Sequence, residues 1–130
     1  DFRAVYRRNA TGVLLAMRFA VPAMLEQKGG AIVNVSSIAG TRYVQPDAAV
    51  AAAAGSVNTQ TIQTAAEFAD RGIRCNALIP MIMDGSEGLD THELDVSDMA
   101  LSLCSDEARY TNGQLINVDM SASWRVTVKL

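Results

Sequence analysis

Charge, aromatic side chains and cysteine are all scarce in this chain of 130 residues. Charged residues make up 19% and aromatic residues 5%, whereas hydrophobic residues reach 49%. Disordered chains are rich in charge and poor in apolar residues, so this composition predicts a folded domain. The net charge is −3, with lysine only at Lys28 and Lys129. This balance disfavours a general nucleic-acid binder, because such proteins are usually basic.

Long hydrophobic runs and paired cysteines are also missing. The longest apolar stretch, residues 10–25, is interrupted by Arg18 and Pro22, and it is shorter than the roughly 20 apolar residues that span a bilayer. Cys75 and Cys104 lack the spacing of metal ligands, and two thiols are too few for a disulfide scaffold. We therefore expect no membrane span, no metal site and a reduced, cytoplasmic protein.

Hydrophobic periodicity divides the chain into helices that alternate with short strands. Helices are predicted over residues 2–27, 46–70 and 96–104, and strands over residues 31–35, 73–79 and 115–118. The β-branched run at 31–35 is typical of a strand buried on both faces. This order predicts the α/β class: a partial Rossmann-like layer of three parallel strands and three main helices.

Apolar residues at helical spacing define one face of each predicted helix. Leu14, Met17 and Val21 mark that face in the first helix. Ile62 is among the apolar anchors predicted for the second helix. Glycines after the two helices are expected to end them, Gly29 after the first and Gly72 after the second.

The third quarter of the chain is acidic. Residues 75–108 contain eight acidic side chains and neither lysine nor arginine. Residues 81–95 are expected to be a solvated loop, although such a charge could also attract a cation or a basic partner. His92, the only histidine, lies in this stretch and is expected at the surface rather than at a metal.

Four short motifs follow one another along the chain. Asn9-Ala10-Thr11-Gly12-Val13 lies in the first helix, and Ile32-Val33-Asn34-Val35-Ser36-Ser37-Ile38-Ala39-Gly40 covers the first strand and its turn. Gly72-Ile73-Arg74-Cys75-Asn76-Ala77 opens the second strand, and Ser105-Asp106-Glu107-Ala108-Arg109-Tyr110 precedes Gly113-Gln114 and Val118-Asp119. In this order, over about residues 9–118, the chain resembles the C-terminal half of the short-chain dehydrogenase/reductases. The resemblance assigns residues 1–124 to that half-domain and leaves 125–130 as a tail.

The resemblance implies NAD(P)-linked oxidation and reduction of alcohols and ketones on a Rossmann-type sheet. In this family a tyrosine hydroxyl passes a proton to the substrate oxygen, and a serine holds that oxygen. A lysine four residues after the tyrosine lowers the phenol pKa through its positive charge, and this spacing puts both side chains on one helix face. An asparagine on the preceding helix supports the proton relay.

Two of these four groups are present and two are replaced. The asparagine falls on Asn9 and the serine on Ser37, whereas the tyrosine and lysine positions hold Val50 and Ala54. No Tyr-x-x-x-Lys occurs anywhere in the chain. The family's Pro-Gly pair at the nicotinamide is here Pro80 followed by methionine, which leaves Pro80 as a weak cofactor-contact candidate.

The cofactor half of the family's fold is expected to be absent. Its Gly-rich turn lets backbone N–H groups approach the pyrophosphate at a helix N-terminus, and no such turn occurs in the sequence. The chain by itself is therefore expected to bind no NAD(P). The lost half would also leave an apolar strand edge uncovered, which predicts self-association or pairing with a missing N-terminal half.

Three functions remain compatible with the sequence. The first is a truncated, catalytically silent relative of the short-chain dehydrogenase/reductases, a pseudoenzyme. The second is an active oxidoreductase whose cofactor half comes from another chain, with Tyr43 standing in for the missing tyrosine. The third is a binding or scaffolding module that uses the alanine-rich helix or the acidic loop.

Overall fold

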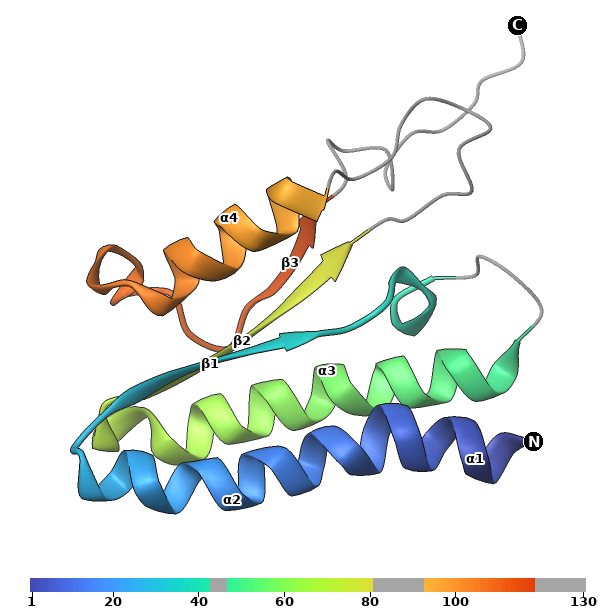
Figure 1. Ribbon diagram of the computed structural model, residues 1–130, viewed down its shortest axis with the longest axis horizontal. Helices are drawn as coiled ribbons and strands as arrows, with labels where there is room; N and C mark the ends of the chain where they lie inside the picture. The colour runs from blue at the N-terminus through green and yellow to red at the C-terminus, as the bar shows by residue number, and fades with distance from the viewer. Residues whose placement is uncertain (43–46, 81–92, 119–130) are drawn as a thin grey trace, which may run out of the picture.

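The chain forms one parallel sheet with helices on both faces (Figure 1). The computed structural model describes residues 1–42, 47–80 and 93–118. In this part the strands β1 (Gly30–Val35), β2 (Ile73–Pro80) and β3 (Leu115–Val118) lie in the order β1-β2-β3. The α-helices are α1 (Phe2–Tyr6), α2 (Gly12–Glu26), α3 (Ala48–Phe68) and α4 (Glu93–Cys104). The predicted α/β class with three parallel strands is confirmed.

The register of the sheet places β2 in the centre. Gly30 of β1 lies opposite Ile73, and Val35 lies opposite Leu78. On the other side of β2, Ala77 lies opposite Leu115. Helices α2 and α3 cover one face of this sheet, and α4 covers the other (Figure 1).

The first helical segment is one run with a widened turn inside it. Between α1 and α2 the backbone forms a π-helical segment, Arg7–Thr11, in which hydrogen bonds reach five residues back. The backbone N–H of Gly12 accordingly donates to the carbonyl of Arg7. The sequence predicted a single helix over 2–27 and gave no sign of this wider turn, which carries Asn9.

The two predicted helix ends are formed differently. After α2, the left-handed residue is Lys28 with φ 62°, and the N–H of Gly29 donates to the carbonyl of Met24 at 2.9 Å. After α3, a 3-10 turn over Ala69–Arg71 ends at Gly72, which has φ 74°. Glycine therefore supplies the left-handed conformation only at the second helix end, where it costs no Cβ clash.

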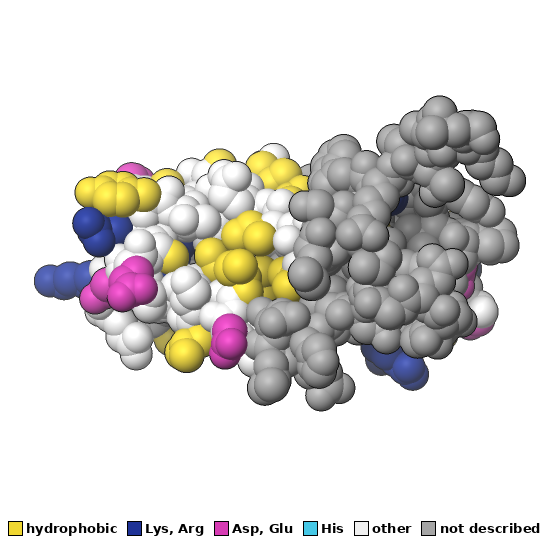
Figure 2. Space-filling view, turned by 90° about the horizontal axis from the view of Figure 1, so that it is seen from above, with side chains coloured by type: hydrophobic (Ala, Val, Ile, Leu, Met, Phe, Trp, Pro, Cys, Tyr) yellow, Lys and Arg dark blue, Asp and Glu magenta, His cyan; other side chains and the backbone are white. Residues whose placement is uncertain are grey.

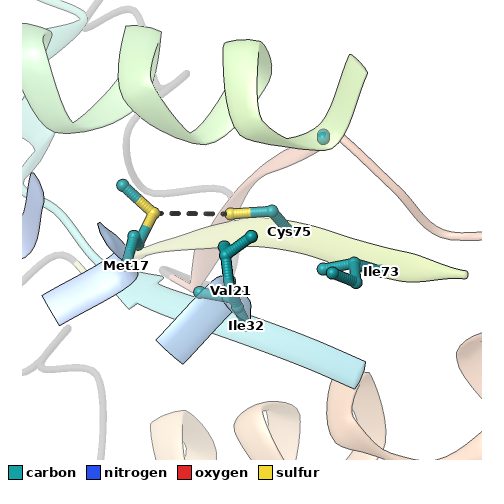
Figure 3. Packing of buried hydrophobic residues seen from close by; sticks show 6 residues of the cluster. Met17, Val21, Ile32, Ile73 and Cys75 are labelled. Carbon is teal, nitrogen blue, oxygen red and sulfur yellow. Dashed lines mark hydrogen bonds between the residues drawn. The ribbon is translucent and has the colours of Figure 1, made fainter. Parts of the chain in front are cut away.

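The core lies between α2, α3 and the centre of the sheet (Figure 3). Its buried members are Met17, Val21, Ile32, Ala65, Ile73 and Cys75. Asn34 of β1 is buried beside this cluster and donates to the Thr61 hydroxyl at 2.9 Å. The predicted role of Cys75 as a small buried hydrophobe is confirmed, and burial raises the pKa of its thiol to about 11.

Two residues of the predicted apolar helix faces are only partly covered. Leu14 of α2 is 50% exposed and Ile62 of α3 is 43% exposed. From α2 the core takes Met17 and Val21, and Leu14 lines a surface groove beside both of them. The apolar stripe of each helix is therefore wider than the side that the sheet covers.

Helix α4 begins at Glu93, before the predicted start at residue 96, so the predicted loop over 81–95 extends too far. Residues 81–92, with His92, lie outside the described residues.

Figure 2 looks onto the face that carries α4, where hydrophobic side chains gather near the middle. In the described ranges, no helix is long and apolar enough to cross a membrane, and no three His, Cys, Asp or Glu side chains form a metal-binding group.

Candidate functional site

A pocket of about 370 Å³ lies where β1 ends, between that strand and the starts of two helical segments. Asn9, Ser37, Val50 and Ala54 all line it. These are the four positions that the sequence singled out, and they come from three separate parts of the chain. Ligands of open α/β sheets commonly bind at the carboxyl ends of the strands, so this is the candidate site.

Ser37 is held by the turn that follows β1. Its backbone is extended, and its Oγ accepts a hydrogen bond from the N–H of Ala39 at 3.2 Å. The neighbouring Ser36 donates its hydroxyl to the carbonyl of Ala54 at 3.2 Å. The end of β1 is thereby fixed against the first half of α3, and both serines line the pocket.

Val50 and Ala54 are positioned by the start of α3. One carboxylate oxygen of Asp47 accepts from the N–H groups of Ala49 and Val50 at 3.0 and 3.1 Å, an N-cap that fixes the first turn. A Cβ at Gly40 would lie 2.7 Å from the carbonyl carbon of Ala54. Only glycine therefore allows the turn after β1 to pack this closely on α3.

Other residues of the pocket were not found from the sequence. Arg8 lies on its polar side beside Asn9, and Val13, Val35 and Val57 add apolar surface. Arg8 and Ser36 could have been suggested by their places in the sequence, because Arg8 directly precedes Asn9 and Ser36 directly precedes Ser37. The three valines carry no sequence signal of their own, because valine is common in any core.

Within the described ranges, no tyrosine or lysine lines the pocket. The Tyr6 hydroxyl donates to Ser56 Oγ at 3.1 Å, and Tyr110 is exposed. Lys28 lies in the turn before β1, at the opposite end of that strand. Tyr43, the predicted stand-in, lies outside the described residues.

The cofactor-contact candidate Pro80 lies at the end of β2, opposite Val118 of β3. It is half-buried and is not among the residues that line the pocket. Its predicted contact with a cofactor stays a prediction, and the methionine after it lies outside the described residues.

The described residues do not fit the phosphates of a dinucleotide. Gly29 and Gly30 follow a helix and precede a strand, the reverse of the strand-to-helix turn that exposes N–H groups to a pyrophosphate. They also lie at the start of β1, whereas the pocket lies at its end.

Comparison with known proteins agrees with the fold. The chain is 33% identical to the inactive 2-(S)-hydroxypropyl-CoM dehydrogenase 2 of Xanthobacter autotrophicus, over 85% of this chain and 59% of that protein. The structure of acetoin dehydrogenase from Salmonella typhimurium superposes with a TM-score of 0.90 at 25% identity, over 97% of this chain and 57% of the other.

A third similar protein, 4-hydroxyisoleucine dehydrogenase, was solved in complex with NADH and succinate. It gives a TM-score of 0.83 at 28% identity, over 91% of this chain and 56% of that one. The present chain thus spans little more than half the length of the relatives that it matches. The sequence profile of the family described as "short chain dehydrogenase" matches residues 1–94. This chain therefore belongs to the short-chain dehydrogenase/reductase family.

Proposed function

We propose that this chain is a catalytically silent member of its oxidoreductase family. The observation that supports silence most directly is the lining of the pocket. Asn9 and Ser37 are retained there, while the positions of the acid and its cationic neighbour are filled by Val50 and Ala54. Aliphatic side chains can neither donate a proton nor stabilise a phenolate.

The missing proton donor accounts for a large loss of rate. A positioned general acid or base contributes about 10²–10⁴-fold to a reaction. The Ser37 hydroxyl cannot replace it, because no base or acid among the described lining residues would exchange its proton. Ser37 could still hold a carbonyl oxygen by hydrogen bonding, so binding without turnover is the expected behaviour.

The poor fit to a dinucleotide bears on what the described residues can bind by themselves. The family acts through NAD(P), and the described residues offer no cradle for its phosphates. NAD(P) binding is therefore proposed to need a phosphate-binding segment in addition to the described residues. An active oxidoreductase completed by another chain remains the alternative, and it would also need an acid in place of Val50.

A factorial experiment separates the two requirements for turnover. The wild-type chain and the Val50→Tyr/Ala54→Lys variant are each assayed with NADH and NADPH on a panel of ketones. Each is tested alone and with the separately expressed N-terminal half of a relative. We expect turnover only where the restored pair and the added half are both present. Steady turnover by the wild-type chain alone would contradict the proposal.

We propose that the open edge of β1 is covered by another polypeptide, either a second copy or a complementary N-terminal half. Among the described strands β1 pairs only with β2, so its other edge offers unpaired backbone groups. Phe19 of α2 is 76% exposed and Leu101 of α4 is 72% exposed, which adds apolar surface to both layers. Light scattering coupled to size-exclusion chromatography tests this proposal. A chain that stays monomeric at high concentration and also does not bind an added N-terminal half would contradict it.

The thiols support a reducing, cytoplasmic location. Cys75 is buried, Cys104 is exposed, and neither forms a disulfide. An exposed unpaired thiol is more often kept in a reducing compartment than in an oxidising one. Cell fractionation with a tagged chain is expected to recover it in the cytosol, and recovery from an oxidising compartment would contradict this proposal.

A further inference from the structure

One charged side chain of the pocket has no part in the proposed loss of activity. Arg8 lines the pocket next to Asn9, and both are exposed, so they lie at its open rim. Within the described ranges the one ion pair joins Arg71 and Asp70, and no acidic residue lines the pocket. The guanidinium of Arg8 therefore meets no anion of the described chain.

Hydrogen bonds inside the pocket leave further donors available. The oxygen of Ser37 accepts from the Ala39 N–H, but its own hydroxyl hydrogen meets no acceptor in the described part of the chain. The Ser36 hydroxyl is already used by the Ala54 carbonyl. The polar side thus offers a cation, a hydroxyl donor and the amide of Asn9, a set that suits an acceptor with negative charge.

The rest of the pocket lining is hydrocarbon. Val13, Val50 and Val57 line it, with Ala54 between the last two in sequence. A volume of about 370 Å³ is in the range of small-molecule sites. Inorganic phosphate would leave these valines in contact with water, whereas an anion with a short hydrocarbon chain would cover them.

We propose that this pocket binds a small organic carboxylate with a short apolar chain. The carboxylate accepts from the Arg8 guanidinium and the Ser37 hydroxyl, and the hydrocarbon lies against Val50 and Val57. The small side chains at positions 50 and 54 leave room for the hydrocarbon. The binding needs neither a nucleotide nor a proton donor, so it is independent of the proposed silence.

Titration followed by backbone amide NMR tests the site directly. Isovalerate is added to the wild-type chain and compared with isovaleramide, which has the same hydrocarbon but no charge. We expect saturable shifts at Ser36, Ser37 and Val50 with isovalerate only, weakening as salt is added. Equal binding of the amide, tighter binding of inorganic phosphate, or the absence of saturable shifts would each overturn the proposal.

Two arginines provide a matched pair of variants. Arg8→Gln removes the charge at the pocket and is expected to weaken isovalerate binding by about tenfold or more. Arg7→Gln removes the same charge one residue earlier, at an exposed position that does not line the pocket, and is expected to change the affinity less than twofold. Equal losses in both variants would show a general charge effect and overturn the assignment. Turnover by the wild type would overturn the proposed silence but not this binding.

Discussion

The guanidinium of Arg74 in β2 donates to the carbonyl of Leu103 in the last turn of α4, at 2.8 Å. A second nitrogen of the same group donates to the carbonyl of Ser105 at 3.0 Å. The last carbonyls of a helix lack partners within the helix and carry partial negative charge. Arg74 satisfies them and fastens α4 to the central strand.

Replacing this arginine should loosen α4. We expect Arg74→Met to lower the free energy of unfolding by about 1.5–3 kcal/mol, the range for hydrogen bonds to charged groups. Arg71→Met is the control, because the Arg71 side chain is exposed and forms an ion pair with its neighbour Asp70 at 4.0 Å; it should change stability by less than about 0.5 kcal/mol. Urea unfolding measures both, and equal effects would contradict the role given to Arg74.

Two glycines that face each other should respond to alanine with opposite signs. A Cβ at Gly40 would lie 2.7 Å from backbone atoms of α3, so Gly40→Ala should destabilise the fold by about 1–3 kcal/mol through overpacking. A Cβ at Gly55 would meet only the Gly40 carbonyl oxygen at 3.9 Å. Gly55→Ala should therefore stabilise α3 by up to about 1 kcal/mol. Thermal melting of both variants checks the signs.

A buried hydrogen bond joins the two layers of the core. Thr61 Oγ1 accepts from the Asn34 amide at 2.9 Å and donates to the Val57 carbonyl at 2.8 Å. Thr61→Val leaves the buried amide without its oxygen acceptor and should cost about 1–3 kcal/mol. Thr59→Val is the control, since its exposed hydroxyl bonds only within the helix. Chemical denaturation measures the free energy of unfolding of both variants. If Thr61→Val lost no more stability than Thr59→Val, the stabilising role of the Asn34–Thr61 hydrogen bond would be refuted.

The buried thiol should make stability fall at alkaline pH. Burial raises the pKa of Cys75 from 9.0 to about 11 in the folded chain. The unfolded chain therefore releases this proton at lower pH, and stability that is full below pH 9 should decline as pH rises toward 11. Cys75→Ala should remove this part of the decline, whereas Cys104→Ser should leave it. Native labelling with a thiol reagent should modify Cys104 only.

The sequence predicted the elements of the fold because each is specified locally. The strand at 115–118 has the predicted bounds, and β2 runs one residue further than predicted, to Pro80. The π-helical turn at Asn9 was not predictable. It differs from the α-helix only in its backbone hydrogen bonds, which reach five residues back instead of four, and no distinctive side chain marks it. The 50% exposure of Leu14 was also not predictable, because periodicity gives a helix face but not how far along it the other layers reach.

The site was predictable only through the family pattern. Asn9, Ser37 and the Val50–Ala54 pair are far apart in the chain and share no local signal, yet the fold brings all four residues to one pocket. Arg8 was passed over because an arginine on an exposed helix is usually only solvated. Its position beside the other pocket residues is a property of the tertiary structure.

The central place of β2 has a consequence for how the chain folds during synthesis. Met17, Ile32 and Ala65 reach the ribosome exit before Ile73 and Cys75, the residues that they enclose. Until β2 emerges, β1 has no strand to pair with among those described. Until β2 is made, the faces of α2 and α3 that enclose Ile73 and Cys75 stay uncovered, and such transiently exposed apolar surface is what chaperones protect.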